Sequence, residues 1–350
     1  MTSSIGLDIG GAHLKACLIR DDTSLKLSKV DLFKTPIWES QNALVSTLKE
    51  IEKRWSIEED TQINTTMTAE MTDCFRDRRE GVQKILSIIK NIFSCEKLKI
   101  YSTNGLKSFN ITLKNYKEIA SSNWHATADT LSKIERNCFL IDIGSTTTDI
   151  IPIQFGKILS PTSSTDFSRL QKGELVYLGV CRTSLSSIRR QLLFRSKMTN
   201  IIRENFASTA DLFRLTKQLN PKYDLYPTFD GKNKTRLATR QRLARIIGLD
   251  THDVTVEEIN ALAQQIKQIF VSEIIENLKK VRIQYNMSSK TPIIITGSGK
   301  FLATEIQNQL NCQTKVYSDL FSNRITIPRT KIDDVDSCAT AFSLAISTYL

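Results

Sequence analysis

The sequence predicts an α/β protein built from two similar lobes. Its 350 residues exceed what one ordinary core needs and suit two domains of common size. A set of apolar strands that enters an aspartate–glycine turn occurs twice, at residues 4–19 and again at 138–158. Such a coarse internal repeat indicates a duplicated lobe. We therefore place an N-terminal lobe at residues 1–135 and a C-terminal lobe at residues 136–350.

Composition favours a folded protein that works in water. Hydrophobic residues make up 40% of the chain and charged residues 24%. No stretch approaches the roughly 18 apolar residues of a membrane span, and the first residues lack a basic segment with a cleavage site. We therefore expect a cytoplasmic location and no membrane partner. The seven cysteines contain no C-x-x-C pair, so we expect reduced thiols rather than a metal site.

The net charge of +11 would attract nucleic acid, an anionic membrane or a phosphorylated small molecule alike. Lysine and arginine are spread along the whole chain, and the densest run is residues 182–203. That run is either a binding site or a solvated face, and both readings stay open. Because a nucleic-acid role would rest on net charge alone, we expect no nucleic-acid partner. The sequence leaves homo-oligomer formation open.

Hydrophobic periodicity predicts the elements of each lobe. The expected strands of the N-terminal lobe are residues 4–7, 15–19, 28–34, 63–67 and 98–101, and its expected helices are 40–55, 79–93 and 115–133. The expected strands of the C-terminal lobe are 138–143, 149–154, a short one from 156, and 292–295.

Helices dominate the rest of the C-terminal lobe. The polar, weakly periodic residues 184–250 predict a mainly helical insertion. A capping box of Thr255 and Glu258 begins a long amphipathic helix. The last helix, 335–350, is apolar on one face and suits packing back on the N-terminal lobe.

The first candidate site is the glycine turn that follows Asp8. Glycines let backbone N–H groups approach a phosphate, and a carboxylate suits Mg²⁺ directly or through water. We assign phosphate binding to Gly10, Gly11 and Lys15, and a catalytic, metal-binding role to Asp8. A hairpin turn with an incidental aspartate would give the same pattern.

The second candidate site repeats this pattern after Asp142. Four residues with hydroxyl groups follow its glycine, and hydroxyls beside free amides suit phosphate oxygens. A threonine-rich strand satisfied by its sheet is the alternative. We assign a metal ligand or base to Asp142 and Asp149. Phosphate binding is assigned to Gly144, Ser145, Thr146 and Thr147.

A third glycine turn follows the strand at 292–295. Gly297, Ser298 and Gly299 lead into a helix, whose start offers unpaired N–H groups and a positive dipole end to an anion. One Gly-x-Gly is weak evidence by itself. A third turn of this kind in a chain with 13 glycines carries more weight.

Six further residues are assigned to substrate binding. The segment with Glu70, Arg76 and Arg78 is either a cleft edge for phosphate and amine groups or a salt-bridged helix start. Trp124 could stack an aromatic ring, although tryptophan is more often a core residue. Arg182 is a candidate phosphate clamp with Glu174 as its partner.

These turns, in this order, resemble the phosphate, phosphate and adenosine turns of the fold shared by sugar kinases, the Hsp70 ATPase and actin. That resemblance implies two ribonuclease-H-like lobes. Within this fold the chain resembles the hydantoinase/oxoprolinase-related proteins linked to tetrahydromethanopterin-dependent one-carbon transfer. The stretches that carry the family resemblance cover most of the chain: residues 8–15, 68–81, 122–128, 140–152, 173–183, 224–234 and 295–301.

The family resemblance implies a transferase of methanofuran biosynthesis. Members look like a synthase that joins an aminomethylfuran-methanol diphosphate to γ-glutamyltyramine, which forms an aryl ether and releases pyrophosphate. The implied partners are thus a small-molecule diphosphate and a phenolic amine, with Mg²⁺ as cofactor and no requirement for ATP. An ATP-dependent small-molecule kinase is the alternative, because the turns themselves indicate only a nucleotide-type phosphate site.

Overall fold

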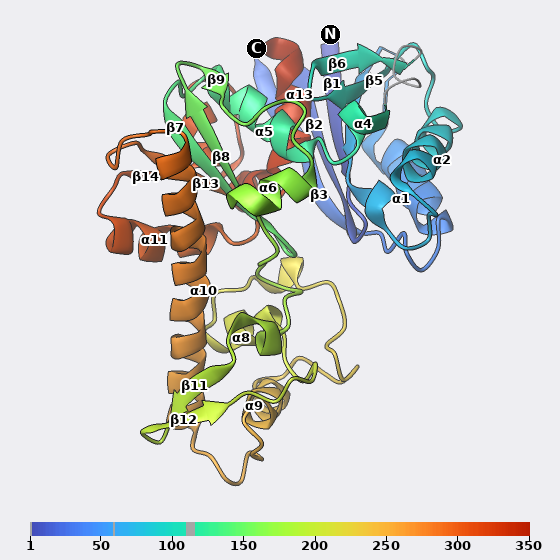
Figure 1. Ribbon diagram of the computed structural model, residues 1–350. Coiled ribbons are helices and arrows are strands. Elements are labelled where there is room, and N and C mark those ends of the chain that lie inside the picture. The colour runs from blue at the N-terminus through green and yellow to red at the C-terminus, as the bar shows by residue number, and fades with distance from the viewer. Residues whose placement is uncertain (1, 59, 110–115) are drawn as a thin grey trace. The chain divides into compact units, whose positions relative to one another are not determined.

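The computed structural model describes residues 2–58, 60–109 and 116–350 (Figure 1). The chain divides into two compact units, one made of residues 1–140, 151–168 and 315–350 and the other of residues 141–150 and 169–314. In the described part of the chain, no helix has the length and apolar character needed to cross a membrane.

A six-stranded sheet forms the centre of the first unit, in the order β3-β2-β1-β4-β5-β6. The first three strands run antiparallel, whereas β1, β4 and β5 run parallel. The strand bounds are β1 (Thr2–Ile9), β2 (His13–Asp21), β3 (Leu25–Lys34), β4 (Gln62–Met67), β5 (Leu98–Ser102) and β6 (Gly105–Ser108).

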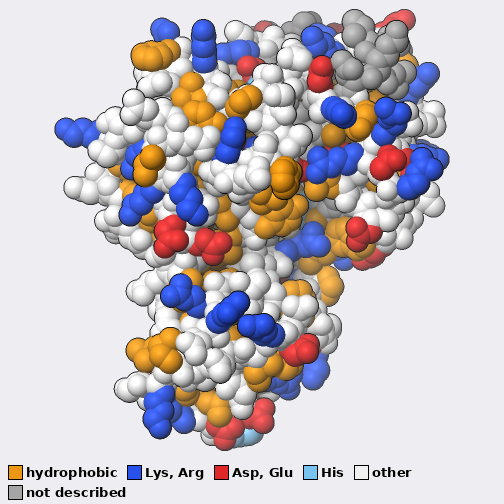
Figure 2. All heavy atoms as spheres, viewed as in Figure 1, with side chains coloured by type: hydrophobic (Ala, Val, Ile, Leu, Met, Phe, Trp, Pro, Cys, Tyr) orange, Lys and Arg blue, Asp and Glu red, His pale blue; other side chains and the backbone are white. Residues whose placement is uncertain are grey.

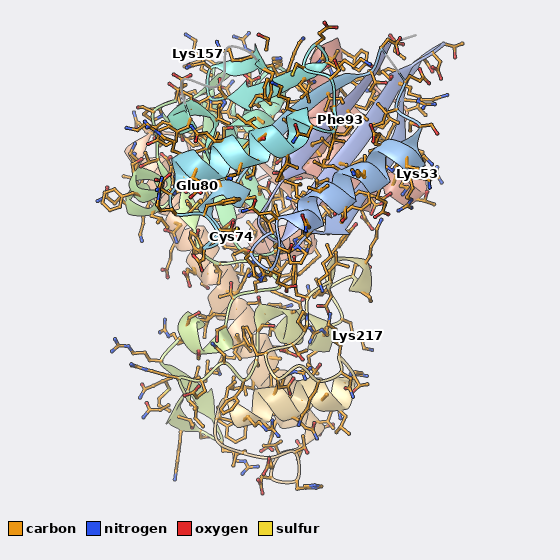
Figure 3. The ribbon with its side chains drawn as sticks, turned by 90° about the vertical axis from the view of Figure 1, so that its right-hand side faces the viewer. Lys53, Cys74, Glu80, Phe93, Lys157 and Lys217 are labelled. Atoms are coloured by element: carbon orange, nitrogen blue, oxygen red, sulfur yellow. The ribbon has the colours of Figure 1, made fainter. Side chains whose placement is uncertain are left out.

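Helices cover both faces of this sheet because its strands alternate in character. Ile5, Leu7 and Ile9 belong to the core shared with α1 (Asn42–Trp55) and α2 (Arg78–Lys90), which lie side by side in Figure 3. On the other face lie α5 (Asn123–Ser132) and α13 (Ala339–Ile346).

Helix α13 packs against β1 so closely that only a glycine fits at position 6. A Cβ atom on Gly6 would lie 1.8 Å from the carbonyl oxygen of Ala341. Asn64 on β4 donates a hydrogen bond to the carbonyl of Leu344 at 2.8 Å. The residues at the end of the described chain therefore complete the layers of the first unit.

The second sheet has the order β10-β8-β7-β13-β14, and β9 pairs with β8. Five of its strands, in the order β9-β8-β7-β13-β14, are arranged by chain order as β3-β2-β1-β4-β5 are in the first sheet. In each sheet three strands adjacent in sequence lie side by side, and two later strands follow beside the first of them. The two-sheet α/β class is thereby confirmed. The bounds are β7 (Cys138–Ile143), β8 (Thr148–Gln154), β9 (Lys157–Ile158), β10 (Leu175–Val176), β13 (Ile293–Thr296) and β14 (Thr314–Val316). The division into compact units cuts through β7 and β8, so the lobe boundary near residue 135 stays a prediction.

The segment 184–250 contains a hairpin as well as helices, so its mainly helical character is not confirmed. Its elements are α7 (Leu185–Ile188), β11 (Gln191–Phe194), β12 (Lys197–Asn200), α8 (Thr209–Leu215) and α9 (Arg236–Arg245). Helix α6 (Asp166–Lys172) precedes it. The long helix α10 (Val256–Gln284) follows, and it begins with the predicted capping box of Thr255 and Glu258.

Two segments that were each predicted to form one continuous helix form two shorter helices. The helix predicted at 115–133 is α4 (Tyr116–Ile119) and α5, separated at Ser121, which has a φ of 52°; Asn115 lies outside the described residues. The helix predicted at 335–350 is α12 (Ile332–Ser337) and α13, separated at Cys338, followed by a short 3₁₀ turn at Ser347–Tyr349. Neither break contains glycine or proline, so neither has a local signal in the chain.

Candidate functional site

The first aspartate–glycine turn joins β1 to β2 in the first unit. The N–H of Gly10 donates to the carbonyl of His13 at 2.9 Å, which closes a tight turn. Asp8 pairs with Lys15 across the two strands, and its Oδ2 lies 3.2 Å from the Lys15 ammonium. Oδ1 of Asp8 is buried and has no hydrogen-bond partner among the described residues. One oxygen of this carboxylate is thus left without a hydrogen-bond partner in the described part of the chain.

The segment that follows β4 packs directly on this turn. Thr68 donates its N–H to the carbonyl of Ile9 at 2.9 Å. A Cβ atom on Gly11 would lie 2.6 Å from Cγ2 of Thr72, and one on Gly10 would lie 2.9 Å from the carbonyl oxygen of His13. Close packing on the backbone therefore favours glycine at position 10 whether or not a phosphate binds, whereas a side chain at position 11 would have to displace Thr72.

Glu70, in the same segment, is buried with a raised pKa. Ser121 donates to Oε1 of Glu70 at 2.8 Å, while Oε2 is buried without a partner among the described residues. Burial raises the pKa of Glu70 to about 7, against the lowering effect of the Ser121 hydrogen bond and the Arg78 charge. Near neutral pH this carboxyl is divided between its two protonation states.

The other predicted substrate residues of the first unit lie in different environments. Arg78 forms an ion pair with Asp166 at 2.7 Å. The Arg76 side chain is 83% exposed and lies 3.7 Å from Asp77. Trp124 is buried and packs edge-on against His125, which favours a core role for its ring.

The second aspartate–glycine turn, between β7 and β8, has the same hydrogen bond. Gly144 donates its N–H to the carbonyl of Thr147 at 2.8 Å. The half-buried residues from Gly144 to Thr147 follow Asp142, which is also half-buried. The hydroxyl of Thr148, one of the four in the run, is used internally because it donates to the carbonyl of Leu178 at 2.7 Å.

Residues 178–182 cover this second turn. The N–H groups of Cys181 and Arg182 both donate to the carbonyl of Ser145, at 3.0 and 2.9 Å. A Cβ atom on Gly179 would lie 2.4 Å from the backbone nitrogen of Thr146. Gly179 is thus required for this approach, and the sequence analysis missed it although it lies in one of the family-resembling stretches.

Asp149 belongs to a buried ion cluster rather than to the exposed edge of the turn. Arg169 donates to Oδ1 of Asp149 at 2.8 Å and lies 3.9 Å from Oε2 of Glu174. Tyr285 donates its hydroxyl hydrogen to Glu174. Glu174 and Arg169 are each 1% exposed or less. These contacts favour a structural role for Asp149 and Glu174.

The third glycine turn packs against the end of β7. Gly297 has a φ of +86°, and a Cβ atom there would lie 2.4 Å from Oδ1 of Asp142. The N–H of Gly299 donates to the carbonyl of Ile143 at 2.8 Å, so this amide is engaged within the protein. Ser298 lies between these two contacts.

Arg182 lies on a small aromatic pocket of the second unit. Its guanidinium carbon lies 5.5 Å from the centre of the Tyr226 ring. The pocket has a volume of ≈ 200 Å³. We call it the Tyr226 pocket, and its wall includes Cys181, Arg182, Arg214, Tyr223, Asp224, Tyr226, Pro227 and Phe229.

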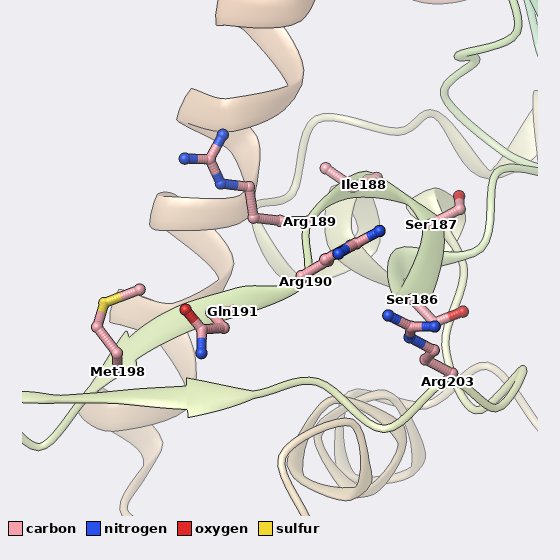
Figure 4. A pocket seen from close by; sticks show the side chains of 8 residues that line it. All are labelled: Ser186, Ser187, Ile188, Arg189, Arg190, Gln191, Met198 and Arg203. Atoms are coloured by element: carbon pink, nitrogen blue, oxygen red, sulfur yellow. The ribbon is translucent and has the colours of Figure 1, made fainter.

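A second, wider pocket lies beside the β11–β12 hairpin (Figure 4). It has a volume of ≈ 530 Å³ and is lined by Arg189, Arg190 and Arg203. Arg190 and Arg203 lie near Ser186, whereas Arg189 points toward α10. Elsewhere, lysine and arginine side chains are scattered over the visible face of the molecule (Figure 2).

The chain shares its fold with acetone carboxylase. The nucleotide-free structure of acetone carboxylase superposes with a TM-score of 0.61 at 11% identity, covering 98% of this chain and 70% of that chain.

Sequence similarity identifies the family as well as the fold. Residues 62–322 match the hydantoinase/oxoprolinase family, and the chain belongs to it. A relative in Methanocaldococcus jannaschii, a (4-{4-[2-(γ-L-glutamylamino)ethyl]phenoxymethyl}furan-2-yl)methanamine synthase, is 31% identical over 309 residues, which is 88% of this chain and 89% of the relative. A synthase of the same name in Methanococcus vannielii is 32% identical over 213 residues, 61% of this chain and 91% of the relative.

Proposed function

We propose that this protein is an aryl-ether-forming synthase of methanofuran biosynthesis. The observation that carries the proposal is the 31% identity over 309 residues with the Methanocaldococcus jannaschii synthase. The name of that enzyme describes a product in which an ether oxygen joins a phenyl ring to a methylene group on a furan. On this proposal the chain forms the same bond.

The reaction balances as a substitution at the methylene carbon of a furan diphosphate. The phenolic oxygen of γ-glutamyltyramine forms the new carbon–oxygen bond, and the bond from that carbon to the diphosphate breaks. The electron pair of the broken bond leaves with pyrophosphate, which also takes up the phenolic proton. The furan ring stabilises positive charge that develops on the methylene carbon. The reaction consumes no ATP, because the furan substrate already carries its diphosphate leaving group.

We propose each aspartate–glycine turn as a phosphate- and metal-binding element of its own unit. Asp8 fits this role because one of its oxygens is buried and unpartnered among the described residues. In the described ranges, no three His, Cys, Asp or Glu side chains are grouped to hold a metal ion. Mg²⁺ is commonly held by one or two carboxylates together with substrate phosphates. When bound, Mg²⁺ would neutralise charge on the diphosphate.

In the second unit, Asp142 takes the corresponding place at its own glycine turn. Gly144 is engaged in closing that turn. The amide of Ser145 is therefore the one that we propose for phosphate oxygens, because Gly179 packs against the backbone nitrogen of Thr146. Because both substrates are charged and water-soluble, we propose that the protein acts in the cytoplasm.

Pyrophosphate release tests this function. The purified protein is incubated with the furan diphosphate, γ-glutamyltyramine and Mg²⁺, with and without ATP, and pyrophosphate and the ether are measured. We expect equal turnover in both samples. Absence of the ether would overturn the proposal, and turnover only with ATP, with release of ADP, would favour a kinase.

A further inference from the structure

We infer that the Tyr226 pocket binds the phenol ring of the acceptor substrate. This inference rests on the proposed function and goes beyond it, because it assigns one of the two substrates to a particular cavity. Three kinds of observation carry it: the connection of the pocket to the second glycine turn, the residues of its wall, and the charge beside it.

The pocket wall continues directly from the second turn. Cys181 and Arg182 line the pocket, and their backbone N–H groups bind the carbonyl of Ser145 in the turn. The glycine at 179 brings the two segments into this contact. A ring in the pocket would therefore lie next to the turn that we propose for the diphosphate, as a substitution at the adjoining carbon requires.

The wall is suited to a flat, electron-rich ring. Tyr223, Tyr226 and Phe229 provide aromatic surface, and Pro227 adds an apolar face. Aromatic pairs gain free energy beyond that of the area they bury. Tyr223 is buried, whereas Phe229 is 45% exposed. Phe229 is thus a part of the wall that can be truncated at little cost to the fold.

Charge distinguishes the phenol from the furan as the occupant. The Arg182 guanidinium lies over the Tyr226 ring. A cation beside the pocket stabilises a phenolate and opposes the positive charge that develops on the furan methylene carbon. The acceptor phenol therefore gains from this position, and the furan does not.

The Asp224 carboxylate and the Cys181 thiol of the wall leave this effect intact. Asp224 is bound by Arg214 and lies 3.0 Å from Lys234, and although burial opposes its ionisation, these cations hold its pKa below the usual value. Burial, followed by the Asp224 charge, raises the pKa of the Cys181 thiol to about 12, so Cys181 is a thiol at neutral pH. The pocket is therefore suited to binding and not to covalent catalysis by this cysteine.

Separate Michaelis constants for the two substrates test the inference. For Phe229→Ala we expect KM for γ-glutamyltyramine to rise by up to about tenfold and KM for the diphosphate to stay unchanged. The matched control is Phe167→Ala, which truncates a phenylalanine that is 70% exposed on α6. Phe167→Ala should alter neither constant. A rise in the diphosphate KM alone, or no change in either, would overturn the inference.

A pH profile provides a readout that a merely structural role of Arg182 would not move. Loss of the guanidinium in Arg182→Met removes the cation that favours the phenolate. We expect the limb of the kcat profile that reports ionisation of the bound phenol to shift to higher pH, and an unshifted profile would contradict the assignment.

Direct binding separates failure of this inference from failure of the proposed function. γ-Glutamyltyramine alone is titrated into the wild-type protein and Phe229→Ala by calorimetry. Saturable binding that Phe229→Ala weakens supports the ring pocket, even if the wild type forms no ether and the proposed function fails. Absence of binding to the wild type, or equal binding to both, overturns the inference even if the wild type forms the ether.

Discussion

The two aspartate–glycine turns share their backbone hydrogen bonds but differ in their charges. Each glycine donates to the third residue after it, from Gly10 to His13 at 2.9 Å and from Gly144 to Thr147 at 2.8 Å. The residue before each glycine also has a similar contact. The carbonyl of Ile9 accepts a hydrogen bond from the N–H of Thr68, after β4, at 2.9 Å, and the carbonyl of Ile143 accepts one from the N–H of Gly299, after β13, at 2.8 Å.

The charges differ at equivalent places. Lys15 lies seven residues after Asp8 and forms an ion pair with it. Seven residues after Asp142, the chain instead has a second carboxylate, Asp149. In the second unit the cation comes from another element, because Arg169 of α6 binds Asp149. A repeated backbone thus holds two different sets of charges, and one turn cannot be assigned a role by analogy with the other.

The largest expected difference concerns these two cations. Arg169→Met would leave the buried Asp149 carboxylate without its arginine, and we expect a loss of about 3–5 kcal/mol in the free energy of unfolding. Lys15→Met should cost about 1 kcal/mol, because the Lys15 side chain is 26% exposed and water can replace part of the interaction. Urea unfolding of both variants measures the difference, and equal losses would contradict the contrast between the turns.

The next prediction concerns how the stability of the protein depends on pH. It involves Glu70, which lies in the segment after β4 that packs on the first turn. The folded state raises the pKa of Glu70 from 4.5 to about 7, so the unfolded state loses this proton first as pH rises. Stability should fall between about pH 4.5 and 7, by about 3 kcal/mol in total, and stay level above that range.

Glu70→Gln should remove this part of the pH dependence and be more stable than wild type at pH 8. Ser121 can still donate to the amide oxygen. Glu52→Gln, on the exposed side of α1, is the matched control and should retain the wild-type profile. Urea unfolding at pH 5 and pH 8 decides the question, and identical profiles for wild type and Glu70→Gln would rule out the assignment.

Activity should be sensitive to both aspartates. Asp8→Asn and Asp142→Asn retain the shape of the side chain but remove its charge, so we expect each to lower kcat by about 10²-fold if it holds or orients a metal. Melting temperatures should change little. If one variant keeps kcat within a few-fold of wild type, its turn does not take part in the reaction, which would sharpen the contrast between the units.

The smallest expected effect tests how closely the second turn is covered. Gly179→Ala would force a Cβ atom to within 2.4 Å of the Thr146 nitrogen, and we expect a loss of about 2 kcal/mol. The control is Gly231→Ala, where nothing lies within 4 Å of the added atom although φ is +66°. Gly231→Ala should cost about 1 kcal/mol. Unfolding free energies that do not differ would contradict the packing described for Gly179.

Much of the fold follows from periodicity, and the exceptions have physical causes. The strand at 138–143 and the long helix after Thr255 were predicted correctly because a local pattern or cap specifies each of them. The break at Ser121 was not predicted, because its left-handed backbone is stabilised by a contact with Glu70, which is distant in sequence.

The same limit applies to the candidate sites. The two aspartate–glycine turns were located because strand, aspartate and glycine are adjacent in the chain. The packing role of Gly179 was missed because its neighbour Thr146 lies 33 residues away (179 − 146). The partner of Asp149 was missed for the same reason, since nothing in the sequence near α6 distinguishes Arg169 from the other arginines.

The position of α13 has a consequence for the order in which the protein folds as it is synthesised. Residues 339–346 cover a face of the first sheet, and Asn64 on β4 has its hydrogen-bond acceptor there. The ribosome makes β1 and β4 long before α13. Until α13 emerges, that face of the nascent sheet lacks its covering helix, and so β1 and β4 cannot complete their packing until α13 has been made.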